Sequence, residues 1–284
     1  MKLLTWNIQW GRGIDGRVDL QRIVREVHRI GDFDLLCFQE VSAGYPELEG
    51  CDGSDQFAAL AARWPRHAAV AGTAVDAPAP GGARRLFGNM IFSRFPVGQV
   101  LRHLLPWPAD PGVKSMQRMA LEATLDTPLG ALRVVSTHLE YYSARQRFAQ
   151  VERLRELQRE GAAQARAARP GSAGDGPFEA LPRGAPALLA GDFNFRPDSA
   201  EHARLLAPFD DDTPAWRDAW QVAHGEGTPH APTVGVHDKA QWPEAAFTCD
   251  FVFVSDDLAP RVRDVRVDAG ADGSDHQPLL LELD

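Results

Sequence analysis

The chain has few of the features that mark secreted, metal-clustered or membrane-spanning proteins. Its 284 residues include only three cysteines, Cys37, Cys51 and Cys249, which form neither an even disulfide set nor a CxxC zinc pattern. No apolar run approaches the ~20 residues that a membrane-spanning helix requires, and the opening MKLLTWN lacks the long apolar segment of a secretion signal. We therefore predict a cytoplasmic protein without a membrane span.

Positive charge is also scarce. The formal net charge of -9 argues against a broadly basic surface that holds nucleic acid. It leaves open an enzyme that meets a phosphate through a metal ion. The arginines between residues 145 and 159 are expected on the solvated face of a helix. No serine lies in a nucleophile-elbow motif, which makes acyl transfer a poor fit.

Linkers and repeats are missing as well. The length suffices for a large core, and no Gly/Ser linker or internal repeat divides the chain, so residues 1–284 are predicted to form one domain. Two segments rich in Pro, Gly and Ala, residues 76–83 and 170–186, are interpreted as surface loops or insertions. The second is long enough to be mobile.

Apolar runs alternate with amphipathic patterns along the chain. Helical spacing predicts helices over residues 20–30, with Asp19 as cap and Gly31 as stop, and over residues 147–157. Strands are predicted at residues 2–6, 34–39, 89–93, 132–137, 187–190, 250–255 and 278–283. Several of these strands are apolar at successive positions, so both of their faces should be covered.

Polar residues cluster at the ends of the predicted strands. Five of these residues follow their strands, namely Asn7, Glu40, His138, Asp192 and Asn194. Three others stand at the start of their strands, namely Asp250, Asp275 and His276. If the last two strands run antiparallel to their neighbours, all eight meet on one rim. Each residue alone is more simply a cap, a turn former or a satisfied structural group. One shared site explains the whole set better.

Such a set indicates metal-assisted phosphoester hydrolysis. Oxygen ligands without a cysteine cluster suit Mg²⁺ or Mn²⁺ rather than structural zinc. Histidines beside carboxylates suit attack of water on a phosphoester, because one imidazole can carry a proton while another stabilises developing charge. The metal would neutralise a phosphate oxygen.

Seven short motifs occur in the order found in a known superfamily. They are TWNIQW, FQE, GNMIFSRFP, STHLE, GDFN, CDFVFVS and SDHQP. Together they resemble the endonuclease/exonuclease/phosphatase superfamily, the DNase I-like hydrolases, over essentially the whole chain. The resemblance implies an α+β fold, a four-layer αββα sandwich of two mixed β-sheets flanked by helices. It specifies the substrate far less, because members of the superfamily cleave nucleic acids, sphingomyelin, inositol phosphates and protein-DNA adducts.

The resemblance also implies a role for each site residue. The residues similar to metal ligands are Glu40, Asn7 and Asp275. Among the residues similar to catalytic ones, Asp192 orients or deprotonates water, and Asn194 contacts the phosphate or the nucleophile. His276 touches the phosphate, and Asp250 orients His276. His138 stabilises charge or protonates the leaving group. A tyrosine replaces His138 in the abasic-site endonuclease branch, which makes that subgroup a poorer match.

Around this site, three arginines are candidate phosphate contacts, because a guanidinium matches phosphate geometry: Arg94, Arg118 and Arg145. Tyr141, Tyr142, Trp10 and Trp107 are candidates to stack on a flat group, although core packing is the commoner fate of aromatics. We expect a divalent-metal-dependent phosphodiesterase acting on DNA or RNA. The alternatives are a phosphoesterase of small molecules or lipid headgroups and, less favoured, a non-catalytic binding module. No protein partner is evident.

Overall fold

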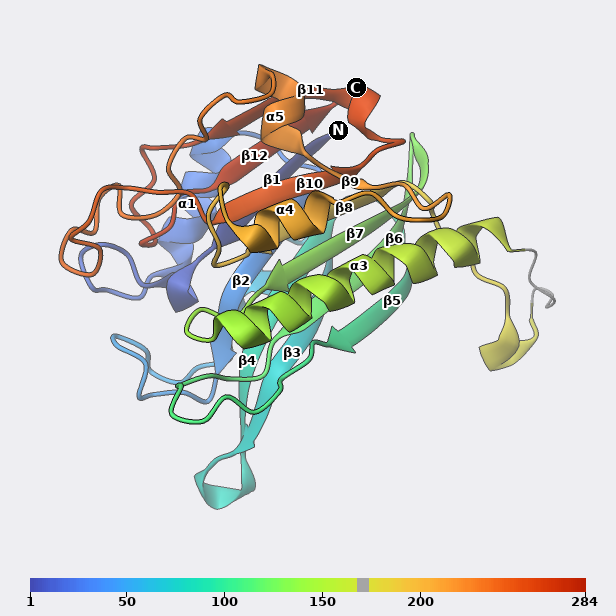
Figure 1. Cartoon of the computed structure of the whole chain (residues 1–284). Helices are drawn as coiled ribbons and strands as arrows, with labels where there is room; N and C mark the ends of the chain where they lie inside the picture. The colour runs from blue at the N-terminus through green and yellow to red at the C-terminus, as the bar shows by residue number, and fades with distance from the viewer. Residues whose placement is uncertain (168–173) are drawn as a thin grey trace.

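The computed structural model describes residues 1–167 and 174–284, and within them two six-stranded sheets lie face to face (Figure 1). In spatial order, the first sheet contains β11 (Val262–Val267), β12 (Leu279–Leu283), β1 (Lys2–Asn7), β2 (Leu35–Ala43), β4 (Arg84–Ser93) and β3 (Ala68–Pro78). The second contains β5 (Val97–Leu104), β6 (Met119–Thr127), β7 (Gly130–His138), β8 (Ala187–Asp192), β10 (Asp250–Ser255) and β9 (Trp216–Asp218). Each sheet has one parallel pair, β1/β2 and β7/β8, among antiparallel ones.

Helices cover the outer faces of both sheets. The five α-helices are α1 (Leu20–Ile30), α2 (Gln56–Ala61), α3 (Ala144–Arg166), α4 (Ala200–Leu206) and α5 (Ala219–His224). Ile23 and Val27 of α1 pack with Trp6 and Phe38 on the first sheet. The long helix α3 crosses the second sheet beside α4 (Figure 1), and α5 contacts β10 and β11. The predicted four-layer αββα sandwich is confirmed.

The core consists of three apolar layers that alternate with the sheets and helices. The central layer fills the space between the sheets with fully buried side chains such as Leu35, Ile91, Leu121 and Leu188. Strands such as β8 and β10, in the middle of the second sheet, bury both of their faces, and their sequences are apolar at successive positions. This agrees with the expectation that both faces of such strands are covered. Polar groups therefore collect at the strand ends.

Helix α1 has the predicted bounds, whereas α3 is longer than predicted. The Asp19 carboxylate accepts hydrogen bonds from the backbone N–H groups of Gln21 and Arg22, and the α1 helix stops at Gly31. Helix α3 begins after the cap Ser143 rather than at residue 147. The expectation that its arginines are solvated was wrong for Arg155, whose guanidinium is buried and donates to backbone carbonyls at the end of α4 and just after it.

The two proline- and glycine-rich segments differ from the prediction in detail. Residues 76–78 extend β3, and only the tip of the β3–β4 hairpin is irregular. This hairpin projects beyond the body of the sandwich (Figure 1). In the second segment, residues 170–173 lie outside the described residues, and Gly176–Phe178 form a short 3-10 helix. None of the helices described is long and apolar enough to cross a membrane.

Strand pairing brings the predicted strand ends together. Strand β10 runs antiparallel to β8 with Asp250 opposite Asp192, and β12 runs antiparallel to β1. The parallel pairing of β7 with β8 puts His138 opposite Asp192. The antiparallel arrangement expected for the last two strands is confirmed, and it places the start of β10 beside the end of β8 and the start of β12 beside the end of β1.

Candidate active site

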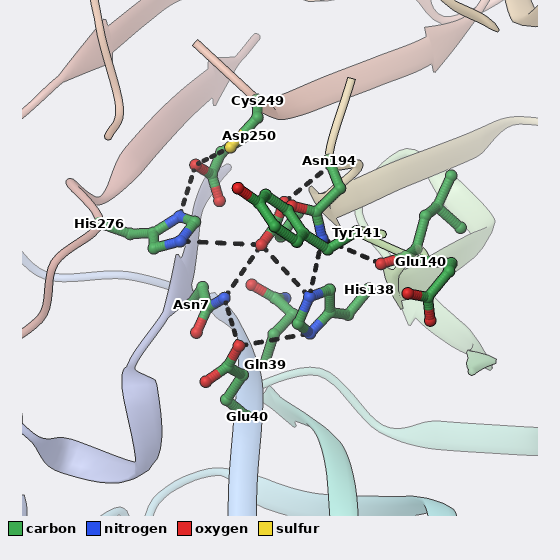
Figure 2. A network of polar contacts seen from close by, with 12 residues as sticks. Asn7, Gln39, Glu40, His138, Glu140, Tyr141, Asn194, Cys249, Asp250 and His276 are labelled. Carbon is green, nitrogen blue, oxygen red and sulfur yellow. Dashed lines mark hydrogen bonds and ion pairs between the residues drawn. The ribbon is translucent and has the colours of Figure 1, made fainter. Parts of the chain in front are cut away.

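A pocket of about 620 Å³ opens at the strand ends that carry the polar residues. Six of the eight predicted strand-end residues line it: Glu40, His138, Asp192, Asn194, Asp275 and His276. Asn7 and Asp250 lie just behind this surface, both almost fully buried, and hydrogen-bond to the lining residues. Figure 2 shows six of the eight converging from both sheets, namely Asn7, Glu40, His138, Asn194, Asp250 and His276.

Local backbone irregularity turns two of the site side chains into the pocket. The β2/β4 register shifts between Phe38 and Val41, and Glu40 within this bulge has a φ of 61°. Asn194, just after β8, has a φ of 52°. Left-handed backbone is uncommon for residues other than glycine and gathers at functional sites. The bulge re-aims Glu40, which a regular strand would point elsewhere.

Asp192 is the centre of the polar network. Its Oδ2 accepts a hydrogen bond of 3.0 Å from the Asn7 amide, and its Oδ1 accepts one of 2.9 Å from the Asn194 backbone. The same Oδ2 lies 3.4 Å from His138 Nε2 and 3.8 Å from His276 Nε2. Burial and the neighbouring Asp250 carboxylate raise the pKa of Asp192 from 3.8 to about 6.

The surroundings of the two histidines that flank Asp192 shift their pKa values in opposite directions. Burial, together with the positive charges of Arg118 and His276, holds the pKa of His138 well below 6.5. An amide nitrogen only donates, so the 3.1 Å contact from Asn194 Nδ2 makes His138 Nε2 an acceptor and the ring neutral. Burial opposes a charge on His276 too, but nearby carboxylates, Asp250 foremost, raise its pKa well above 6.5.

The Asp250–His276 pair is a direct contact. His276 Nδ1 lies 2.9 Å from Asp250 Oδ2, which leaves Nε2 directed toward Asp192 (Figure 2). The hydroxyl of Thr233 lies 3.3 Å from the backbone nitrogen of Asp250 and accepts from it. A carboxylate that binds one ring nitrogen fixes the direction of the other, so Asp250 orients His276.

Carboxylate oxygens suited to a divalent cation lie on the side of the pocket formed by Glu40 and Asp275. Burial and the nearby Asp275 carboxylate raise the pKa of Glu40 from 4.5 to about 7. Such a rise means that the carboxylates lack a compensating charge, which a hard divalent cation would supply. The residues present therefore fit a divalent cation. Asn7 turns its amide nitrogen to Glu40 Oε1 at 3.1 Å, so in this conformation it links Glu40 to Asp192.

A second group of potential ligand atoms comprises Asp192, Cys249 and His276, which approach one another within 4.8 Å. Burial and the charges of Asp192 and Asp250 raise the pKa of the Cys249 thiol well above 9.0. A protonated thiol is a poor ligand, and the cationic His276 ring has no free lone pair. The Glu40 and Asp275 oxygens therefore suit a cation better than this second group does.

The three candidate arginines occupy different places. Arg118 lines the pocket, and its Nε lies 3.3 Å from Glu140 Oε2 while its Nη1 has no hydrogen-bond partner. Arg94 follows β4 at the opposite end of the sheet and pairs with Asp32. Arg145 donates to the Ala109 carbonyl and does not line the pocket.

Of the candidate aromatic residues, Trp10, Tyr141 and Tyr142 line the pocket, and Trp107 does not. Sequence reasoning missed Gln241 and Trp242, which both donate to Asp275 Oδ2 at 2.9 Å. They lie in a loop without a recognisable motif. Only their proximity in three dimensions reveals them.

Comparison with known proteins agrees with this geometry. Residues 4–276 match the model of the Endonuclease/Exonuclease/phosphatase family. No curated protein matches the chain. An endonuclease/exonuclease/phosphatase from Bacteroides vulgatus is 19% identical, with a TM-score of 0.66 and coverage of 100% of this chain and 98% of its own.

Two further solved structures are similar over the whole chain. A mannosyl-6-phosphatase from Bacteroides thetaiotaomicron is 15% identical with a TM-score of 0.64, covering 100% of this chain and 99% of its own. The 3′ phosphatase NExo from Neisseria, bound to a product DNA hairpin, is 20% identical with a TM-score of 0.63 and the same coverage. These likenesses show a common fold, and the family model extends over nearly all of the sequence. The chain belongs to the endonuclease/exonuclease/phosphatase family and is a hydrolase that acts on phosphoester bonds.

Proposed function

We propose that the protein is a divalent-metal-dependent phosphoester hydrolase in which Asp192 activates the attacking water. The observation that carries this proposal is the placement of one buried carboxylate between a neutral and a charged imidazole. Groups whose pKa values are pushed apart in one site are suited to divide acid and base roles. A non-catalytic binding module would have no need for this arrangement.

The residues of the chain divide the work of hydrolysis. With its pKa at about 6, Asp192 is largely ionised near neutral pH and accepts the proton of a water molecule that attacks phosphorus. The charged His276 ring stabilises the negative charge that grows on the phosphate oxygens. His138 is neutral, which favours a hydrogen-bonding role over protonation of the leaving group.

We propose Mg²⁺ or Mn²⁺ as the cation, held by Glu40 and Asp275 with Asn7 beside them. Oxygen donors of this kind are the usual partners of hard divalent ions. When bound, the ion would withdraw charge from a phosphate oxygen and favour departure of the leaving group. Arg118, whose Nη1 has no hydrogen-bond partner, offers the phosphate a donor from the other side of the pocket. The Asn194 amide would have to release His138 or the Leu139 carbonyl to contact the phosphate.

Nucleic acid is a candidate substrate beside simple phosphate esters. Tyr141 and Trp242 line the pocket with ring centroids 6.0 Å apart, and flat bases stack on aromatic side chains. The decisive experiment is hydrolysis, with Mg²⁺ or Mn²⁺, of simple phosphate monoesters and diesters beside single- and double-stranded DNA. Asp192→Ala, purified in the same way, should be slower by on the order of 10²-fold or more, and absence of all hydrolysis by the native protein would refute the proposal.

Removal of the cation is expected to lower thermal stability. A cation at 100 times its dissociation constant stabilises the folded state by about 2.7 kcal/mol, which for a chain of this size raises Tm by several degrees. Thermal melts with Mg²⁺ and with EDTA would measure the difference. Glu40→Gln should abolish it, whereas Glu47→Gln, at an exposed carboxylate, should keep it. An unchanged Mg²⁺ response in Glu40→Gln would remove Glu40 from the metal site.

In the absence of the cation, stability is expected to fall as the pH rises. The pKa of Glu40 is higher in the folded chain than its usual 4.5, so its contribution is complete below about pH 4.5 and is lost as the pH rises through about 7. At 1.36 kcal/mol per pKa unit, the loss is about 3 kcal/mol. Denaturant titrations in EDTA at about pH 5 and about pH 8 would measure it. Glu40→Gln should flatten the dependence to the part due to Asp192, and an equally steep slope in that variant would contradict the assignment.

A further inference from the structure

We propose that the pocket contains an apolar subsite, the wall formed by Tyr45, Leu48, Val75 and Phe87, which binds a flat or apolar organic group of a small phosphoester. This inference rests on the proposed function and names the class of substrate that it serves. The four residues line the same pocket as Glu40 and Asp192. They belong to the segment after β2 and to the β3–β4 hairpin, which projects beyond the sandwich in Figure 1.

The apolar wall has a fixed shape. Tyr45 and Phe87 pack edge to face with centroids 6.4 Å apart, and the Arg85 guanidinium lies over the Tyr45 ring at 5.7 Å. Arg85 is also paired with Glu47 at 2.7 Å. The β3/β4 register shifts between Thr73 and Val75, and such a bulge redirects the side chains that follow it. A preformed apolar surface binds a rigid ligand without paying for its own ordering.

Close backbone packing fixes the position of the wall beside β4. Gly44, the residue before Tyr45, has a φ of 75°, and a Cβ atom there would lie 2.5 Å from the Arg84 carbonyl oxygen. Only glycine allows this approach. The segment that carries Tyr45 and Leu48 is therefore held against the hairpin rather than free in solvent.

The charges of the pocket favour a small substrate over a polynucleotide. Its lining contains the carboxylates Glu40, Glu140, Asp192 and Asp275, but besides His276 it has only one lysine and one arginine, Lys114 and Arg118. Arg118 is only 6% exposed and pairs with Glu140.

Arginine at the hairpin is also engaged, because Arg84 pairs with Asp76 at 2.7 Å. Polynucleotide binding depends on neutralising successive phosphates with Lys and Arg. The pocket can therefore meet one phosphate and one apolar group, but it offers no track for a phosphate backbone.

The test compares two phosphonates that carry the same anion and differ only in their organic group. Calorimetric titration of the native protein in Mg²⁺ with phenylphosphonate and methylphosphonate should show about tenfold or more tighter binding of the phenyl compound, because its ring is removed from water against the wall. A short single-stranded oligodeoxynucleotide should bind more weakly than phenylphosphonate. Binding is measured directly, so the result does not depend on turnover.

Variants of the wall identify where the ring binds. Leu48→Asn, at a half-buried position, should reduce the preference for phenylphosphonate to about threefold or less while leaving methylphosphonate affinity unchanged. Phe87→Leu keeps an apolar side chain, and it should reduce the preference less. Leu104→Asn, at a residue that is 61% exposed and outside the pocket, is the matched control.

Three results would overturn the apolar subsite: equal binding of the two phosphonates, binding of neither, or tighter and strongly salt-dependent binding of the oligonucleotide. Failure of the subsite and failure of the proposed function can be told apart. A protein that hydrolyses simple esters without the phenyl preference keeps its function and loses the subsite. A protein that prefers phenylphosphonate but hydrolyses no ester loses the proposed function.

Discussion

Replacement of Asp192 by alanine is expected to lower kcat by on the order of 10²-fold or more, because it removes the group that accepts the proton of water. The folded structure should persist. The raised pKa of Asp192, about 6, shows that its charge is unfavourable in the fold without a cation. Steady-state kinetics on whichever ester is hydrolysed, with a thermal melt of the same preparation, would measure both effects.

Asp192→Asn provides the sharper comparison. The amide keeps the size of the side chain and one acceptor oxygen, which preserves the hydrogen bond from either Asn7 or the Asn194 backbone, but it cannot take up a proton. We expect activity as low as in Asp192→Ala, with stability in EDTA at about pH 8 equal to or above that of the native protein. Asp256→Asn, at an exposed carboxylate beyond the end of β10, is the matched control. Near-native turnover in Asp192→Asn would refute the role of Asp192 as base.

The convergence of the site could be predicted from sequence because strand ends carry a strong signal. Asn7, His138 and Asp192 each stand where a continuously apolar run stops, and such runs are buried strands. Asp250 and His276 stand at the starts of runs, so an antiparallel pairing was required to bring them to the same rim, and β8/β10 and β1/β12 provide it. The apolar runs, together with antiparallel pairing, thus sufficed to predict these strands and the convergence of the polar residues at their ends.

The strands at the edges of the sheets were harder to predict from the sequence. Strand β5 is half exposed along its length and alternates Gly, Gln and Arg with apolar residues, so it lacks the run that marks a central strand. Strand β3 is rich in alanine and continues into the proline-rich segment, which we interpreted from the sequence as a loop. Side-chain packing with β4 and β6, rather than local propensity, determines these edges.

The apolar wall and the partners of Asp275 could not be predicted for a different reason. Tyr45, Leu48 and Phe87 appear in the sequence as ordinary apolar residues. The pairing of β2 with β4 and the packing of Gly44 against Arg84 bring their segments together beside the catalytic residues. The backbone angle of Glu40 is likewise a product of the register shift with β4. Such features depend on tertiary pairing, which has no local signature.

His276→Ala is expected to lower kcat by on the order of 10²-fold or more, because it removes the charged donor beside the phosphate. Asp250→Asn should lower activity less, since it leaves the imidazole in place. Combined with His276→Ala, Asp250→Asn should add little, because Asp250 acts through His276 at 2.9 Å. The measurement is a double-mutant cycle on kcat/KM.

The pH dependence separates an orienting role of Asp250 from a merely structural one. Asp250 is the foremost of the carboxylates that raise the pKa of His276 well above 6.5, and activity that needs the charged ring is lost as the pH rises through that pKa. Asp250→Asn should therefore move the alkaline limb of the kcat/KM profile to lower pH and recover part of its activity in mildly acidic buffer. A structural role would lower activity equally at every pH. An unshifted limb, or strictly additive effects in the cycle, would show that Asp250 does not act through His276.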